Sequence, residues 1–184
     1  SLTPQQQVVR RLSRYAADQG LSEAITYRFV PEADGGRLHL PADDDRRRVI
    51  RLSNALSDEM AVMRRSLLPG LLRAVERNQS HQRRDGAIFE VGRTYIPEVD
   101  GLADEPEELT AVLFGAPGAR GWRQAPADVD VWSATGLAIA MAASLPPPSL
   151  LLVVLTVLTL ASSGSSSPPP YPVVVIPLST DIFL

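Results

Sequence analysis

The side chains of this chain that could carry out chemistry are of few kinds: carboxylates, arginines and two histidines. None of the 184 residues is cysteine, which excludes disulfides, zinc-thiolate sites and thiol nucleophiles. All 18 basic residues are arginine, so chemistry that needs lysine, such as Schiff-base formation or P-loop phosphate binding, is also excluded. His39 and His81 lie in polar stretches without acids at ligand spacing, so we predict surface histidines and no metal site.

Two arginine-rich stretches could bind an anion. The acids 43–45 precede the arginines 46–48, a run that is typical of a solvated loop with local ion pairs. Arg10, Arg11 and Arg14 share one face of a predicted helix, which is either a solvated surface or a contact with a partner or RNA. The formal net charge of −3 gives no field that would draw the whole chain to nucleic acid or lipid, so any such contact is local.

The elements that must position these side chains follow from caps and periodicity. Thr3 and Pro4 predict a helix start, and apolar residues at helical spacing continue to Gly20. Alternation of apolar and polar residues predicts a strand over 23–30, ended by Pro31. The same reasoning predicts a short extended piece at 60–63, a helix after Pro69, strands at 87–96 and 109–114, and a helix at 130–143 with Ser133 as a possible cap.

A Pro-Gly pair, Pro69 and Gly70, lies between two pairs of leucines, 67–68 and 71–72. Inside a helix, this pair would break it. We therefore predict that the pair marks a packing junction, where a helix begins after an extended segment and its leucines bury beneath a sheet.

Two ordered motifs occupy the middle of the chain, and they carry a family resemblance. The first is Asn54-Ala-Leu-Ser-Asp-Glu-Met-Ala-Val-Met-Arg-Arg-Ser-Leu-Leu-Pro-Gly-Leu-Leu72, and the second is Ala87-Ile-Phe-Glu-Val-Gly-Arg-Thr-Tyr95. They closely resemble the bacterial phenylalanyl-tRNA synthetase beta chain, which reads approximately Asn-Pro-Leu-Ser, Leu-Arg-Thr-Ser-Leu-Leu-Pro-Gly-Leu-Leu and Phe-Glu-Ile-Gly-Arg there. Residues 25–29, 121–122 and 130–136 are also similar to stretches of that family, so the resemblance covers residues 1–143.

The resemblance implies an α+β fold, an antiparallel sheet flanked by helices, similar to the core of class II aminoacyl-tRNA synthetases. It also implies one catalytic-like core domain over 1–184, cut from a longer chain that belongs to a cytoplasmic heterotetramer. In that family this core is non-catalytic, while the alpha subunit activates phenylalanine with ATP and magnesium and charges tRNA. The fragment itself is then expected to bind no cofactor and to meet tRNA only through the holoenzyme.

The resemblance also identifies which residues stand at a vestigial site. Active class II enzymes carry a pattern like Gly-Arg-x-Tyr-Arg-x-Glu, whose second arginine neutralises the ATP α-phosphate. Here that position is Ile96, and no stretch of the chain matches the late Gly-x-Gly-x-x-Arg motif, so no catalytic residue is predicted. Arg64 is expected to form an ion pair or a carbonyl contact in the core, or else to contact a ligand. Glu90 and Arg93 should point to opposite faces of a strand, one of them towards the vestigial cleft.

The last forty residues, 145–184, differ in composition from the rest. They hold one charged residue, Asp181, and eight of the sixteen prolines. The apolar run 150–160 is about half the roughly 20 residues that a membrane helix needs, so we predict buried strands there and at 171–176, and no membrane contact. A genuine low-complexity tail, a frameshift and residues assigned without knowledge of the true sequence all stay open. The assignment of this stretch is therefore doubtful.

Two functions from different classes fit these observations. The first is a non-catalytic beta-subunit core that supports assembly with the alpha subunit; the alternative is a free-standing paralogue that binds a small molecule or a protein. An independent ligase is disfavoured by Ile96 and by the missing late motif. A domain isolated from its partner should expose a large apolar patch, whereas a self-sufficient module should not.

Overall fold

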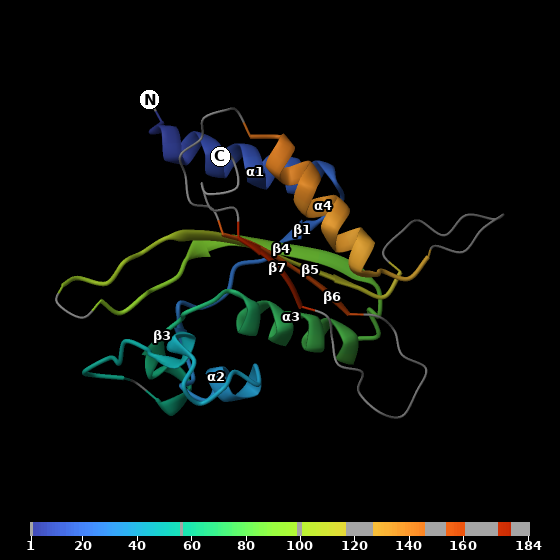
Figure 1. Cartoon of the computed structure of the whole chain (residues 1–184). Coiled ribbons are helices and arrows are strands. Elements are labelled where there is room, and N and C mark those ends of the chain that lie inside the picture. Colours follow the sequence, from blue (N-terminus) through green and yellow to red (C-terminus); the bar gives the residue numbers. More distant parts are fainter. Residues whose placement is uncertain are drawn as a thin grey trace.

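The computed structural model describes residues 2–55, 57–98, 101–116, 127–145, 154–160 and 173–177. Helices α1 (Pro4–Asp18) and α4 (Val131–Ala143) cover one face of the main sheet, and α3 (Leu68–Ser80) lies on the other (Figure 1). The strands are β1 (Ser22–Glu23), β2 (Phe29–Val30), β3 (Val62–Met63), β4 (Gly86–Arg93), β5 (Glu107–Phe114), β6 (Val154–Leu160) and β7 (Val173–Pro177). Short helices complete the set: α2 (Asp34–Arg37), η1 (Asp45–Arg47) and η2 (Asp58–Met60).

The main sheet has the strand order β1-β4-β5-β6-β7 and is mixed. The α+β class with flanking helices is confirmed, but the expectation of an antiparallel sheet is wrong for β1–β4 and β5–β6, which are parallel. The pairs β4–β5 and β6–β7 are antiparallel. The chain must cross back over the sheet between β5 and β6, and α4 makes that crossing, so the two strands run the same way.

The predicted single strand 23–30 is wrong, because the chain leaves one sheet and joins another within it. Ser22 and Glu23 pair with Ile88 and Phe89 of β4. Phe29 and Val30 pair instead with β3 in a second, two-stranded sheet. Alternation along the sequence identified an extended segment, but it carries no information on which strand each half meets.

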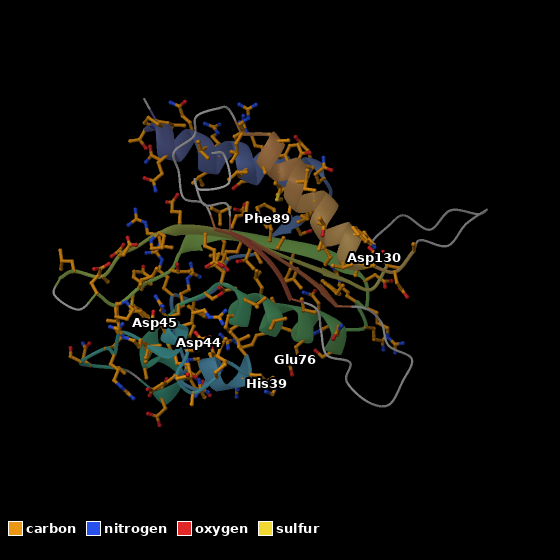
Figure 2. The ribbon with its side chains drawn as sticks, in the orientation of Figure 1. His39, Asp44, Asp45, Glu76, Phe89 and Asp130 are labelled. Atoms are coloured by element: carbon orange, nitrogen blue, oxygen red, sulfur yellow. The ribbon has the colours of Figure 1, made fainter. Side chains whose placement is uncertain are left out.

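One core layer packs α1 and α4 against the sheet. Thr3 caps α1 with a capping box to Gln6, as the Thr-Pro start predicted. The buried side chains of the two helices meet inward-facing residues of β4 and β5; the layer contains Val8, Leu12, Ala16, Phe89, Leu109, Ala111, Ala134, Ala138 and Met141. Figure 2 shows Phe89 on the side of the sheet that these helices cover.

A second core layer packs α3 against the opposite face. Leu68, Leu71 and Val75 of the helix contact Ile88 of β4 and Val112 of β5. Pro69 lies in the first turn of α3, where a missing N–H leaves no helical hydrogen bond unmade. The helix start at the Pro-Gly pair is thus where the sequence predicted it.

Helix α4 is capped by Asp130, and not by Ser133 as predicted. The Asp130 carboxylate accepts hydrogen bonds from the Ser133 N–H at 2.8 Å and from its hydroxyl at 2.8 Å. Ser133 is the third residue of the helix and returns a contact to the Asp130 N–H at 3.3 Å. These bonds lower the pKa of Asp130, because they favour its charged form.

Replacing Asp130 by alanine should lower the free energy of unfolding by about 1 kcal/mol, since the first turn of α4 loses its side-chain acceptor. Urea denaturation monitored by circular dichroism measures the change. The matched control is Asp43→Ala, an exposed acid with no recorded partner among the described residues, and it should shift the value by less than about 0.5 kcal/mol. Equal effects of the two substitutions would contradict the capping role.

The predicted strands in the anomalous stretch are confirmed over 154–160 and 173–177, where they extend the main sheet as β6 and β7. The remainder of 146–184 lies outside the described residues, as do the Gly121-Trp122 pair and most of the 115–120 loop. Among the described helices, none is both long enough and apolar enough to span a membrane.

Candidate functional site

A buried polar cluster joins three segments that are distant in the sequence. Arg64 donates from Nη1 to Oε1 of Glu90 at 2.7 Å, and both residues are 3% exposed. The Thr26 hydroxyl donates to the other oxygen of Glu90 at 2.7 Å and accepts from Arg64 Nη1 at 3.1 Å. Arg64 Nε donates to the Arg93 carbonyl at 2.9 Å. Each charge is therefore paired and hydrogen-bonded, as burial requires.

Each of the three side chains in the cluster comes from a different segment of the chain. Thr26 lies between β1 and β2, Arg64 follows β3 directly, and Glu90 lies in the middle of β4. Because side chains alternate along a strand, Glu90 shares the α3 face of the sheet with Ile88, whereas Phe89 faces α1 and α4. The cluster thus sits on the sheet face next to the start of α3.

Glycines allow the cluster to pack this closely. A Cβ on Gly92 would lie 2.3 Å from Arg64 Nη2, and a Cβ on Gly70 would lie 2.5 Å from the Thr26 hydroxyl oxygen. Distances below 3.0 Å require something to move. Gly70 therefore does more than accompany Pro69 at the helix start, because it lets α3 approach the Thr26 segment.

The Arg93 side chain points away from the cluster and towards solvent. It is 51% exposed, and it donates from Nη1 to Glu105 Oε2 at 3.0 Å. Glu90 and Arg93 thus point away from each other, as their spacing on β4 requires. Only the main-chain carbonyl of Arg93 belongs to the cluster.

Ile96, at the position expected for a phosphate-binding arginine, is half-buried and has no side-chain donor. Its N–H donates to the Asp104 carbonyl at 2.9 Å, and its carbonyl accepts from the Asp104 N–H at 3.0 Å. The main chain at this position is therefore fully engaged in closing the loop between β4 and β5.

The arginines Arg10, Arg11 and Arg14 do not join the cluster. They are exposed on α1, on the opposite face of the sheet, around an open hollow of about 510 Å³ that Tyr15 and Asp18 also line. Contact of this surface with a partner or with RNA stays a prediction. Among the described residues, no group of three or more acids and histidines is placed to hold a metal ion.

Two acids of the 43–48 run, Asp44 and Asp45, form ion pairs in an exposed loop that lies on the same side of the main sheet as α3 (Figure 2). Asp44 accepts from Arg46 Nε at 2.9 Å and from Arg46 Nη2 at 2.6 Å, and Asp45 pairs with Arg48 and Arg65. This is the solvated loop with local pairs that the sequence favoured. The Arg46 side chain, helped by its N–H, lowers the pKa of Asp44 to about 2.

An NMR titration of Asp44 should give a midpoint near pH 2, against an ordinary value of 3.8. Because the folded pKa is lower than the unfolded one, the stabilisation by this pair is complete above about pH 4 and disappears as the pH falls through about 2. Arg46→Gln should return the midpoint towards 3.8, and Arg10→Gln on α1 should leave it unchanged. A wild-type midpoint near 3.8 would show that the pair does not form in solution.

Thr26 is the member of the cluster that the sequence did not single out. A threonine in an alternating stretch is typical of any strand, and its partner Glu90 is 64 positions away. The alternation over 23–30 does place Thr26 on the side opposite Ile25 and Tyr27, and this was the one feature of the sequence that could have indicated a buried threonine.

Comparison with known proteins gives one consistent family. Residues 1–152 match the model of the phenylalanyl tRNA synthetase beta chain CLM domain. The chain is 41% identical over 142 residues to the phenylalanine–tRNA ligase beta subunit of Novosphingobium aromaticivorans, and 36% identical over 140 residues to that of Geobacter sulfurreducens. These matches cover 77% and 76% of this chain but 17% and 18% of the relatives, so the chain spans less than a fifth of their length. A solved pyrrolysyl-tRNA synthetase from Desulfitobacterium hafniense is 19% identical, with a TM-score of 0.42 over 52% of this chain and 33% of that one.

Proposed function

Because this chain belongs to the phenylalanyl tRNA synthetase beta chain CLM domain family, we propose that it is a non-catalytic core that supports assembly of a phenylalanine–tRNA ligase. Its partner in this proposal is the alpha subunit. That subunit would bind ATP and magnesium, activate phenylalanine and charge tRNA. We propose that this core has a fold like that of class II synthetases. The mixed sheet with helices on both faces supports this proposal.

The observation that carries the proposal is the state of Arg64, whose guanidinium is buried on the α3 face of the sheet. An adenylating site needs a guanidinium free to meet the α-phosphate as charge develops. Arg64 is instead bonded to Glu90, to Thr26 and to the Arg93 carbonyl, and Ile96 stands where the phosphate arginine is expected. These side chains hold the sheet face together and offer no cation to a nucleotide.

Exposed apolar side chains favour an assembly role over a self-sufficient module. Ile25, Tyr27 and Leu102 are 91%, 76% and 94% exposed, and Trp132 on α4 is 75% exposed. Single exposed apolar side chains are normal on any protein surface, but neighbouring ones such as Ile25 and Tyr27 are typical of a surface that a partner covers. The exposure therefore supports the beta-subunit role.

The test is a pull-down of the full natural chain with the alpha subunit of the same source, followed by ATP–pyrophosphate exchange. We expect a stable complex, no exchange by this chain alone, and phenylalanine-dependent exchange by the complex. Failure to bind the alpha subunit would favour a free-standing binding module. Exchange by this chain alone would contradict the non-catalytic role assigned through Ile96.

A further inference from the structure

Residues 31–60 form an excursion from the two-stranded sheet. Val30 of β2 pairs with Val62 of β3, so the chain leaves and re-enters this sheet at neighbouring positions. The excursion contains α2, which lies beyond α3 on the side away from the main sheet (Figure 1). We call its described residues, 31–55 and 57–60, the lobe.

The lobe has almost no core of its own. Among its described residues no apolar side chain is buried, and the one buried residue is Asp34, which is 5% exposed. Its helices are also short, since α2 has four residues and η1 and η2 have three each. Helices of this length are not stable alone, and a segment with few buried apolar contacts opens at a low cost in free energy. The lobe therefore depends on its contacts with the rest of the chain.

An ion pair joins the lobe to α3. Arg73 of the helix donates from Nη1 to both carboxylate oxygens of Asp34, at 2.9 and 3.0 Å. Leu38 of the lobe packs against the α3 core layer as well. The side chain of Asp34 is 7% exposed, whereas Arg37, which lies 4.0 Å from it, is 69% exposed. A buried carboxylate is stable only when it is paired, so Arg73 is the group that allows Asp34 to stay buried.

The second ion pair between the lobe and the rest of the chain is weaker. Arg65 donates from Nη2 to the Asp45 carboxylate at 3.2 Å, but the Asp45 side chain is 64% exposed. The Nε of Arg65 is buried and has no partner in the part of the chain that the structure describes. Charged groups of the lobe lie around Arg65, so opening of the lobe would return this Nε to water. Because a buried donor without an acceptor is costly, it favours opening.

The sheet beneath α3 does not depend on the lobe. β4 and β5 have eight residues each and pair along their whole length, and core layers cover both faces of the pair. Leu71 and Val75 of α3 are 0% and 2% exposed and belong to the layer that packs against these strands. We therefore expect α3 and the sheet to stay in place when the lobe opens.

We propose that the lobe is a lid over the outer side of α3, that it opens as one unit while the main sheet stays folded, and that the Asp34–Arg73 pair is the latch that keeps it closed. The paired strands β2 and β3 are the hinge, because both ends of the lobe start from them. Opening would uncover the side of α3 that carries Arg73. The inference goes beyond the proposed function and does not rest on it, since every contact involved lies within this chain.

Hydrogen–deuterium exchange of the full natural chain, measured by mass spectrometry of its peptides, tests the lid. Two amides report on distant parts of the lobe: Leu38 donates to the Asp34 carbonyl at 3.1 Å, and Leu52 donates to the Ala61 carbonyl at 3.0 Å. In Arg73→Gln, the peptides that contain these two amides should both exchange about tenfold faster or more, because the buried carboxylate has lost its partner. Peptides of β4 and β5 should exchange within about twofold of wild type.

The matched control is Arg77→Gln, one turn further along α3. Arg77 is exposed, and its side chain has no recorded partner among the described residues, so exchange in the lobe should stay within about twofold of wild type. A second variant, Asp34→Asn, removes the latch from the other side and leaves α3 unchanged. It should also speed exchange of both lobe peptides, by about threefold or more, because the charge-assisted bonds to Arg73 are lost.

Faster exchange near Leu38 alone would overturn the proposal, because it would show that the lobe does not open as one unit. An equal rise in β4 and β5 would show that the whole fold is destabilised, and it would overturn the proposal as well. A similar effect of Arg77→Gln, or no effect of either latch variant, would show that the Asp34–Arg73 pair does not hold the lobe closed. The Arg73 side chain is 40% exposed, so the variants should fold, as circular dichroism would show.

Discussion

Replacing Arg64 by methionine should lower the free energy of unfolding by about 3–5 kcal/mol, which is a large share of the 5–15 kcal/mol that ordinarily separates folded from unfolded protein. Methionine keeps much of the volume but leaves Glu90 buried without its counter-charge. The Arg93 carbonyl loses its donor as well. Urea denaturation of the variant and the wild type measures the loss.

The double variant Arg64→Met/Glu90→Leu separates the cost of an unpaired charge from the value of the pair. Replacing both partners removes the unpaired carboxylate, so the double variant should be more stable than Arg64→Met alone. Arg93→Met is the control, because its side chain is half exposed and its pairs with Glu105 and Glu107 lie near the surface, and it should cost less than about 1 kcal/mol. If the double variant were less stable than Arg64→Met, Glu90 would stabilise the fold through contacts other than its pair with Arg64.

Replacing Gly70 by alanine should lower the free energy of unfolding by about 1–3 kcal/mol, although alanine is the better helix former. The new methyl group would lie 2.5 Å from Thr26 Oγ1 and 2.8 Å from Thr26 Cβ. Thr26 cannot move aside without breaking its bonds to Glu90 and Arg64. The steric cost should therefore exceed the gain in helix propensity, and urea denaturation gives the sign.

Gly136→Ala in α4 is the matched control for this prediction. A Cβ at Gly136 would have open space around it, with nothing within 4 Å. Only the helix-propensity term then acts, so this variant should be more stable than wild type by about 0.5–1 kcal/mol. If Gly70→Ala were stabilising by a similar amount, Thr26 would be free to move aside, and the close approach of α3 to it would not require a glycine.

The sequence alone predicted much of the local structure, because local signals are what it contains. The Thr3-Pro4 cap and the helix start at Pro69 were predicted correctly. The two hairpin strands were predicted at 87–96 and 109–114, and they lie at Gly86–Arg93 and Glu107–Phe114, so their type was correct and their bounds were not. The cap of α4 was misplaced by three residues, since Asp130 and Ser133 are both good caps and the capping box uses both.

For the site, the sequence named Arg64 and Glu90 but could not say that they meet. Their contact spans 26 positions, and that of Thr26 with Glu90 spans 64. Such contacts follow from which strands lie side by side, and alternation along a strand fixes only which face a residue takes. The absence of lysine and cysteine, by contrast, needed no structure.

By itself, the sequence determined the family, most of the short-range elements and the presence of Ile96 where the resemblance expects a phosphate-binding arginine, because motifs and residue types are carried in the order of the chain. Only the tertiary structure decided that the sheet is mixed, that Arg64 pairs with Glu90, and that the segment 23–30 divides between two sheets. The direction of a strand within a sheet, the burial of a side chain and the pairing of polar groups depend on neighbours brought from elsewhere in the chain. They exist only once those neighbours are in place.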